Sequence, residues 1–277
     1  MKINRPSICE CALLGGRFAD QLKLGLFGFL APLFNTSRHC WGRPISRLVP
    51  NRMWIKPRNL NGFQLLVDPT DWSQTVIFRE VFLESNYDLD RVKFAPTVII
   101  DCGAHIGMFS LLARSRYQSA ELIAYEPNPR NAEIIRLLIA KNRLALSFNE
   151  CAVSTESAEL SFVAINSHGG RLAGKESAHL KMGDSPVYKV QVVDFPAALR
   201  AMYIESLLLK MDIEGEERNV LPAIMPLLPR RTALFFETHH GKVGWSEIEG
   251  LLTRNGFTVE QINARGLYCD GFASRLS

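Results

Sequence analysis

The 277-residue sequence predicts an α/β protein built on a doubly wound, mostly parallel sheet. Short runs of apolar, often β-branched residues alternate with segments of helical periodicity along the chain. Several of these runs also end on an acidic residue. Because ligands bind beyond the carboxyl ends of the strands in such sheets, the second observation predicts a functional site there.

The expected strands follow one another in a regular order. Residues 97–100 form the first, and a glycine turn and an apolar stretch of helical spacing follow it. Residues 121–125 form the second, and Asn128 and Pro129 then suit the N-cap and the first position of a helix. Further strands are expected at 147–153, 206–211 and 233–236, then a helix at 245–252 and two strands at 257–262 and 267–272.

The chain divides into an N-terminal extension and a main domain. Residues 1–60 lack sustained periodicity, and we expect them to be partly helical; residues 61–277 form the main domain. An insert at about 154–205 contains His168-Gly169-Gly170 and a strand-like run at 187–193. Long connections usually serve function, so we expect this insert to cover the substrate.

Composition limits the classes of partner. Apolar residues make up 47% and charged residues 22%, as in a globular protein. The 32 Lys and Arg residues exceed the 28 acidic ones by too little to predict nucleic-acid binding. The six cysteines lack C-x-x-C spacing, and scattered thiols are typical of a reducing cytoplasm. We therefore expect a cytoplasmic protein; the sequence does not predict its oligomeric state.

Residues 22–34 are apolar but do not predict a membrane-spanning helix. A spanning helix needs about 20 apolar residues, and this run is short, carries Lys23 and is interrupted by Pro32. It starts too late for a signal peptide and has no clear cleavage pattern. We favour a structural helix, with contact to a membrane surface or a partner as the alternative.

The segment from Val98 to Gly107 joins a strand to a helix through a glycine turn, which presents N–H groups to a ligand. A dinucleotide fingerprint fails here, because His105 and Met108 occupy two of its glycine positions. Asp101 would repel a pyrophosphate but can accept hydrogen bonds from an ammonium group. The turn therefore favours S-adenosylmethionine over a nicotinamide cofactor, although a glycine turn can also simply pack a helix on a strand.

Glu126 strengthens the prediction of an adenosyl ligand. It follows the second strand, 25 residues after Asp101. An acidic residue in this place can accept both ribose hydroxyls of an adenosine. A solvated carboxylate at a helix start is the alternative.

Two more strand ends supply candidate catalytic groups. Lys210, Asp212 and Glu214 share one side of an extended chain, and Lys210 could pair with an acid or hold a substrate hydroxyl. Beyond the next strand, His239 could act as a general base and Glu237 could orient a hydroxyl. For three neighbours we expect no catalytic role, assigning the first two to helix N-terminal charge: Glu216, Glu217 and His240. We expect no metal; a divalent ion that positions a diol is the alternative.

Five segments, in order and with similar spacing, resemble the FkbM family of S-adenosylmethionine-dependent methyltransferases. They are DCGAHIGMFSLLAR, AYEPNPRNAEIIRLLIAKN, NECAVS, LLLKMDIEGEERNVL and LFFETHH, and VFLESNYDLD resembles a short segment upstream of them. The resemblance covers about residues 75–260. It implies the class I methyltransferase fold, a Rossmann-like sheet of seven strands with one antiparallel strand near the C-terminus.

The resemblance also implies O-methylation of a sugar, as in glycans and lipopolysaccharides, or of a secondary metabolite. By motif, Glu126 would hold the ribose, with Asn128 beside it. His105 occupies a position where the family often has Asn. The remaining residues would line the methionine end or border the adenine: Asp101, Gly103, Ala104 and Gly107, then Cys151 and Ala152.

Two other functions stay open on the sequence alone. One is a nicotinamide-dependent oxidoreductase, and the other is a module that binds an adenosyl ligand without turnover. No motif in the sequence identifies the methyl acceptor.

Overall fold

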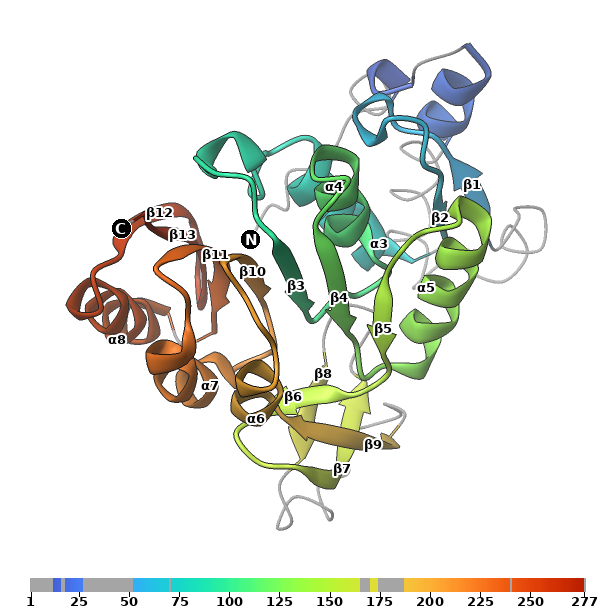
Figure 1. Ribbon diagram of the computed structural model, residues 1–277. Coiled ribbons are helices and arrows are strands. Elements are labelled where there is room, and N and C mark those ends of the chain that lie inside the picture. Colours follow the sequence, from blue (N-terminus) through green and yellow to red (C-terminus); the bar gives the residue numbers. More distant parts are fainter. Residues whose placement is uncertain are drawn as a thin grey trace. The chain divides into compact units, whose positions relative to one another are not determined.

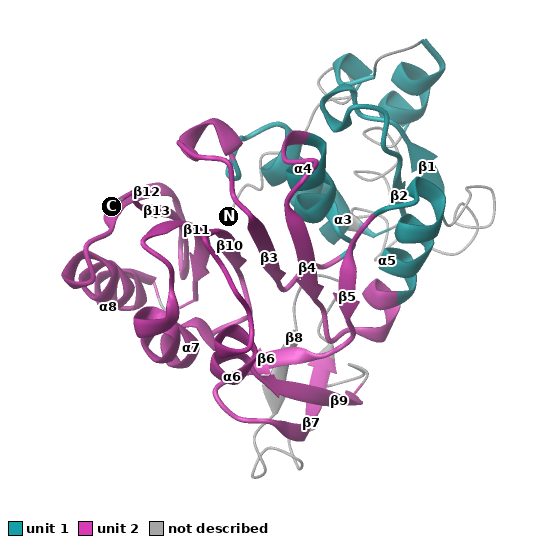
Figure 2. Ribbon diagram, in the orientation of Figure 1, with its two compact units in different colours: residues 1–87, 106–115, 133–144 teal, residues 88–105, 116–132, 145–277 magenta. Residues whose placement is uncertain are grey.

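The structure is a computed structural model, shown in Figure 1. It describes residues 12–15, 18–26, 52–69, 71–164, 170–173, 187–239 and 241–276. These form two compact units, which Figure 2 distinguishes by colour. One comprises residues 1–87, 106–115 and 133–144, and the other comprises residues 88–105, 116–132 and 145–277.

A seven-stranded sheet lies entirely in the second unit. Its order is β12-β13-β11-β10-β3-β4-β5, and β13 alone of these strands runs antiparallel to its neighbours. The strands are β3 (Val98–Cys102), β4 (Glu121–Tyr125), β5 (Ser147–Asn149), β10 (Ser206–Met211), β11 (Arg231–Thr238), β12 (Thr258–Arg265) and β13 (Tyr268–Arg275). The predicted fold of six parallel strands and one antiparallel strand is confirmed.

The strands β3 and β10 form the centre of this sheet. Every residue of both is buried, as expected for parallel strands that are covered on both faces. The chain order reverses between them, because β4 and β5 follow on one side and β11 on the other. Their register pairs Asp101 with Lys210 and Cys102 with Met211. Polar side chains from both strand ends therefore meet at the point where ligands bind in sheets of this kind.

One helix cap that the sequence predicts is present, and the helices of the second unit pack on the main sheet. At the start of α5 (Pro129–Asn142), the Asn128 carboxamide accepts the Arg130 N–H at 3.1 Å, so the expected N-cap is confirmed. Apolar side chains of α6, α7 and α8 belong to one core with β3, β10 and β11. The other labelled helices are α3 (Trp72–Phe82), α4 (Met108–Arg116), α6 (Phe195–Arg200), α7 (Glu217–Ile224) and α8 (Gly241–Arg254), and the labelled 3-10 turns are η1 (Arg58–Leu60), η2 (Leu89–Arg91) and η4 (Met225–Leu227).

The insert forms a sheet of its own, which corrects one expectation. A single strand over 147–153 is wrong, because the chain leaves β5 at Glu150 and enters a four-stranded sheet. That sheet has the order β6-β9-β7-β8, with β6 (Ala152–Ser154), β7 (Ala158–Ala164), β8 (Gly170–Ala173) and β9 (Val187–Asp194). Apolar residues on both sides of the break hide this change of sheet in the sequence. His168 and Gly169 lie outside the described residues.

The first unit contains the described part of the N-terminal extension. Residues 18–26 are helical, and β1 (Met53–Ile55) pairs with β2 (Leu65–Val67). Gln64 and Asn142 exchange two hydrogen bonds of 2.7 and 2.8 Å, which tie the segment after β1 to the end of α5. Among the described helices, none is long and apolar enough to cross a bilayer.

Candidate functional site

The turn after β3 has a backbone that requires glycine. Gly103 has φ +78°, and a Cβ there would lie 1.9 Å from the Asp212 carbonyl oxygen. The Gly103 and Ala104 N–H groups both donate to the Tyr125 carbonyl at 3.0 Å, which fixes the turn to the end of β4. His105 also has a positive φ of 51°, in the region that Asn and His enter more readily than most residues. This conformation agrees with the family's frequent Asn at the His105 position.

Glu126 joins this turn to the start of α5. It is 5% exposed, and its carboxylate accepts the His105 N–H at 2.8 Å and the Asn128 N–H at 2.9 Å. The Asn131 carboxamide donates to it at 3.3 Å. Burial raises the pKa of Glu126 to about 7, and these three hydrogen bonds oppose that shift. Three predicted cofactor residues, His105, Glu126 and Asn128, therefore meet around one buried carboxyl.

Cys151 and Ala152 lie just beyond the end of β5. The Glu126 N–H donates to the carbonyl of Asn149, the last residue of β5, at 3.1 Å. Cys151 and Ala152 therefore follow a residue that is bonded directly to Glu126. Ala152 is buried, and burial raises the pKa of the Cys151 thiol to about 11. Their role at the adenine stays a prediction.

Gly107 belongs to the first unit, unlike the other predicted cofactor residues. Its φ is +81°, and its carbonyl accepts the Leu111 N–H at 3.0 Å at the start of α4. The glycine is therefore explained by the backbone, and its contact with a cofactor stays a prediction.

Lys210 is a buried ion-pair partner rather than a free cation. Its ammonium donates to the Gly103 carbonyl at 2.5 Å and lies 3.5 Å from Asp212 and 3.8 Å from Asp101. Burial favours the neutral amine, but the neighbouring carboxylates outweigh it and raise the pKa of Lys210. Asp101 is completely buried beside this ammonium. Lys210 therefore links the Gly103 turn to the buried carboxylate of Asp101.

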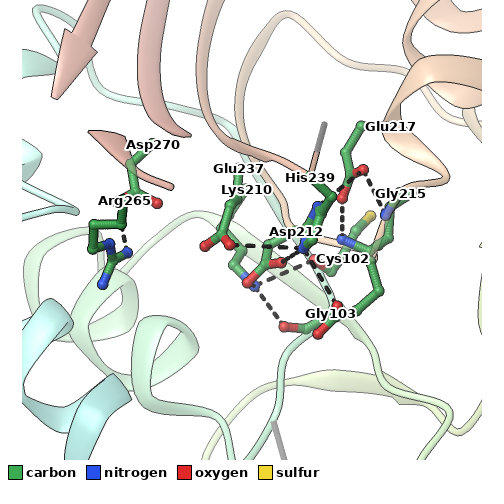
Figure 3. A network of polar contacts seen from close by, with 12 residues as sticks. Cys102, Gly103, Lys210, Asp212, Gly215, Glu217, Glu237, His239, Arg265 and Asp270 are labelled. Atoms are coloured by element: carbon green, nitrogen blue, oxygen red, sulfur yellow. Dashed lines mark hydrogen bonds and ion pairs between the residues drawn. The ribbon is translucent and has the colours of Figure 1, made fainter. Parts of the chain in front are cut away.

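Three predicted catalytic acids surround His239, and Figure 3 shows two of them, Asp212 and Glu237, beside it. Its Nε2 atom lies 3.4 Å from Glu214, 3.7 Å from Glu237 and 3.8 Å from Asp212. Asp212 also faces Lys210, so it bridges the two cations of the site. The carboxyl ends of β10 and β11 thus supply one continuous polar cluster.

The charge of His239 differs from what a general base requires. Burial favours the neutral imidazole, but Glu214, Glu217 and Asp212 outweigh it and raise the pKa of His239 to about 12. The side chain is therefore an imidazolium at neutral pH, already surrounded by carboxylates. A carboxylate is the better proton acceptor in this cluster.

Glu217 is a site residue that the sequence interpretation assigned to helix N-terminal charge. It is 1% exposed, and its two oxygens accept the Ile213 N–H at 2.5 Å and the Gly215 N–H at 2.8 Å. One of these oxygens also lies 3.5 Å from His239 Nδ1. Glu214 and Gly215 have φ of 59° and 106°, so this carboxylate holds a strained turn as well as the imidazole. The signal available in the sequence was an acid shortly after a glycine.

Asp270 and Arg265 were also missed. Asp270 lies opposite Glu237 in the β11–β13 pair and is hydrogen-bonded to it. Burial raises the pKa of the Asp270 carboxyl, and Arg265 binds that carboxyl at 2.8 Å. Asp270 falls in the expected strand at 267–272 and Arg265 in the connection before it, and the register of that strand with β11 was not predicted.

Three described residues are close enough to share a cation. Asp212, Glu217 and His239 each offer one ligand atom, and these atoms lie within 4.8 Å of one another. Both oxygens of Glu217 already accept main-chain N–H groups, and His239 is charged in this setting. The cluster is thus arranged as a set of ion pairs. His240 lies outside the described residues.

Comparison with known proteins gives a consistent set of similarities. The family model described as "Methyltransferase FkbM domain" matches residues 101–259. Methyltransferase sdnD of Sordaria araneosa is 27% identical over 219 residues, covering 68% of this chain and 83% of that protein. The 31-O-demethyl-FK506 methyltransferase FkbM of Streptomyces tacrolimicus is 28% identical over 212 residues, covering 66% and 81%. A solved FkbM methyltransferase from Methylobacillus flagellatus superposes at a TM-score of 0.46 with 12% identity, covering 96% of this chain and 57% of that one.

Proposed function

The chain belongs to the FkbM methyltransferase family, and on this basis we propose that it methylates a hydroxyl oxygen of a sugar or a secondary metabolite. The family match covers more than half of its length and makes it a methyltransferase that uses S-adenosylmethionine. A nicotinamide-dependent oxidoreductase is therefore no longer a candidate. The finer proposal rests on the chemistry of the polar cluster.

The cofactor fits the residues around Glu126. The methyl donor carries ribose hydroxyls, which donate to a carboxylate, and Glu126 is a buried carboxyl at the expected strand end. The turn itself approaches the end of β10 closely, because Gly103 has no Cβ to meet the Asp212 carbonyl. We assign Glu126 to the ribose, and Gly103 and Ala104 to the methionine end.

The observation that carries the proposal is the position of Asp212. Its main chain touches the Gly103 turn, and its side chain faces both Lys210 and His239. It therefore stands between the predicted cofactor residues and the cluster at the end of β11. A hydroxyl held by Asp212 would be adjacent to the methyl donor.

Methyl transfer needs alignment and a proton acceptor. S-adenosylmethionine supplies a sulfonium methyl group: the hydroxyl oxygen forms a bond to that carbon, the carbon–sulfur bond breaks, and S-adenosylhomocysteine leaves. Asp212 takes the hydroxyl proton, because His239 is already protonated. Alignment contributes up to about 7–11 kcal/mol, and a general base about 10²–10⁴-fold. Lys210, Glu217 and His239 hold the carboxylates in place.

The choice of oxygen has one further support. The Streptomyces relative is named for a 31-O-demethyl acceptor, so its printed name describes methylation at an oxygen.

Product analysis tests this proposal. The protein is incubated with S-adenosylmethionine that carries a labelled methyl group and with a panel of sugars and hydroxylated metabolites, and the methylated atom is identified by mass spectrometry and NMR. We expect an O-methyl ether as the product, and we expect Asp212→Asn to lower its rate of formation by about 10²-fold or more. Glu247→Gln removes an acid that pairs with Arg218 on the surface and should leave turnover unchanged. Label on nitrogen or carbon would overturn the proposal.

A further inference from the structure

The helix at residues 18–26 exposes large apolar side chains, which a helix that only covers a core would not do. Phe18, Leu22 and Leu26 are 75%, 58% and 43% exposed, while Leu24 is completely buried. Positions spaced by four residues lie on one face of a helix. The helix therefore buries one side in its own unit and presents a second apolar side to solvent. Phe18, Leu22 and Leu26 are called the apolar face below.

The sequence from this helix onward is strongly basic. Between Asp20 and Asp68 it carries seven Lys and Arg residues and no acidic residue. The remainder of the chain is acidic on balance, because the whole sequence has only four more cations than anions. The basic excess is thus concentrated in the unit that carries the apolar face.

Some of these cations lie beside the helix. Lys23 is exposed on the helix itself. Gly15 forms a bridge with Pro57, and the Arg58 N–H donates to the Leu14 carbonyl at 2.6 Å. The segment with Lys56 and Arg58 therefore adjoins residues 14 and 15, shortly before the helix in sequence.

We propose that this face docks on an anionic membrane surface. An apolar helix face flanked by Lys and Arg inserts its aromatic and aliphatic side chains at the headgroup boundary, and the cations attract acidic lipids. A second copy of the chain is a poorer occupant, because two such basic surfaces repel each other. The proposal is independent of the acceptor and of the site in the other unit.

Vesicle sedimentation tests the proposal with the full-length protein. Vesicles of phosphatidylcholine alone are compared with an equal mixture of phosphatidylcholine and phosphatidylglycerol. We expect partitioning onto the mixed vesicles to be at least about tenfold stronger, and to weaken as salt screens the charges. Equal partitioning onto both kinds of vesicle would overturn the proposal.

Matched variants separate this face from general stickiness. Phe18→Gln, Leu22→Gln and Leu26→Gln together keep helix-forming residues and should lower partitioning by about tenfold or more. Tyr203→Gln, Val243→Gln and Leu276→Gln together remove three exposed apolar side chains of the other unit and should leave it unchanged. Leu22→Gln and Lys23→Gln alone should each give a smaller loss, which covers the case in which the triple variant fails to fold.

Two results would contradict the assignment. One is a control triple variant that loses as much binding as the face variant. The other is a wild-type dimer in size-exclusion chromatography that the face variant dissociates, which would assign the face to a second copy instead. Methyl transfer to a water-soluble acceptor should be the same in the wild type and in both triple variants.

Discussion

Glu126 is the residue of the predicted cofactor site whose ionisation is made unfavourable by burial. Its carboxyl is buried among N–H donors, and burial still raises its pKa to about 7. In the free protein it is therefore largely protonated below that pH. Ionisation costs the folded state up to about 3 kcal/mol as the pH rises from about 4.5 to about 7. Ribose hydroxyls would donate to the ionised form and recover part of this cost.

Cofactor affinity should consequently depend on pH. Below about pH 7 the carboxyl must release a proton before it can accept two hydroxyls, so affinity should fall toward tenfold per pH unit as the pH decreases. Calorimetry between pH 5.5 and 8 would measure both the affinity and the proton released, and Glu126→Gln should remove the slope. Affinity that is independent of pH in the wild type would contradict this role.

Glu217 should act as a positioning residue. Glu217→Gln loses an ion pair with His239 and at least one main-chain acceptor, so we expect a stability loss of about 1–3 kcal/mol in denaturant unfolding. Turnover should fall while cofactor affinity stays within about threefold, because the residue braces the β10 end and not the Glu126 pocket. Glu216→Gln, next to it but bonded to Ser154 and Asn219, is the control and should change both by much less. Equal effects of the two variants would exclude the positioning role.

The strand ends explain which site residues could be predicted from the sequence. Each of four acids directly follows an apolar run: Asp101, Glu126, Asp212 and Glu237. Because the runs form parallel strands, these acids are expected at the same edge of the sheet. Asp270 reaches the same edge through an antiparallel register, which no local pattern encodes.

At the scale of elements, the β3–α4 turn and the end of β10 are built against each other. Gly103 is the point of contact, because only a residue without Cβ leaves room for the Asp212 carbonyl. The central strands were predictable from their continuous apolar runs. The break between β5 and β6 was not, since each is only three residues long and the difference lies in the strands with which they pair.

Gly103→Ala tests this contact against a matched glycine. Gly266 also has a positive φ of 68°, but a Cβ there would meet nothing within 4 Å. Gly266→Ala should therefore cost about 1–2 kcal/mol from backbone strain alone. Gly103→Ala adds a clash with main chain, so it should cost more in thermal unfolding and should also weaken cofactor binding. Similar losses for both variants would show that the close approach is unimportant.

Across the whole molecule, the second unit holds all seven strands of the main sheet and the complete polar cluster. In that cluster Lys210 and His239 balance part of the charge of five carboxylates: Asp101, Asp212, Glu214, Glu217 and Glu237. The remaining negative charge suits a cationic methyl donor. The same acids would also suit a divalent ion. A cluster of ion pairs and a metal site differ in whether methyl transfer needs a metal.

Chelation separates these accounts. Because the cluster is already satisfied by ion pairs and main-chain donors, we expect methyl transfer to be unchanged after dialysis against EDTA. Turnover would be followed with the labelled donor before and after dialysis. A loss of activity that added magnesium or manganese restores would show that the acids hold a metal.

The most direct test of the account is a calorimetric titration of S-adenosylmethionine into three proteins: the wild type, Glu126→Gln and Asp212→Asn. The account predicts one bound molecule per chain, a loss of affinity of about tenfold or more for Glu126→Gln, and a change within about threefold for Asp212→Asn. It would be contradicted if the wild type bound no S-adenosylmethionine, or if Glu126→Gln bound it as tightly as the wild type.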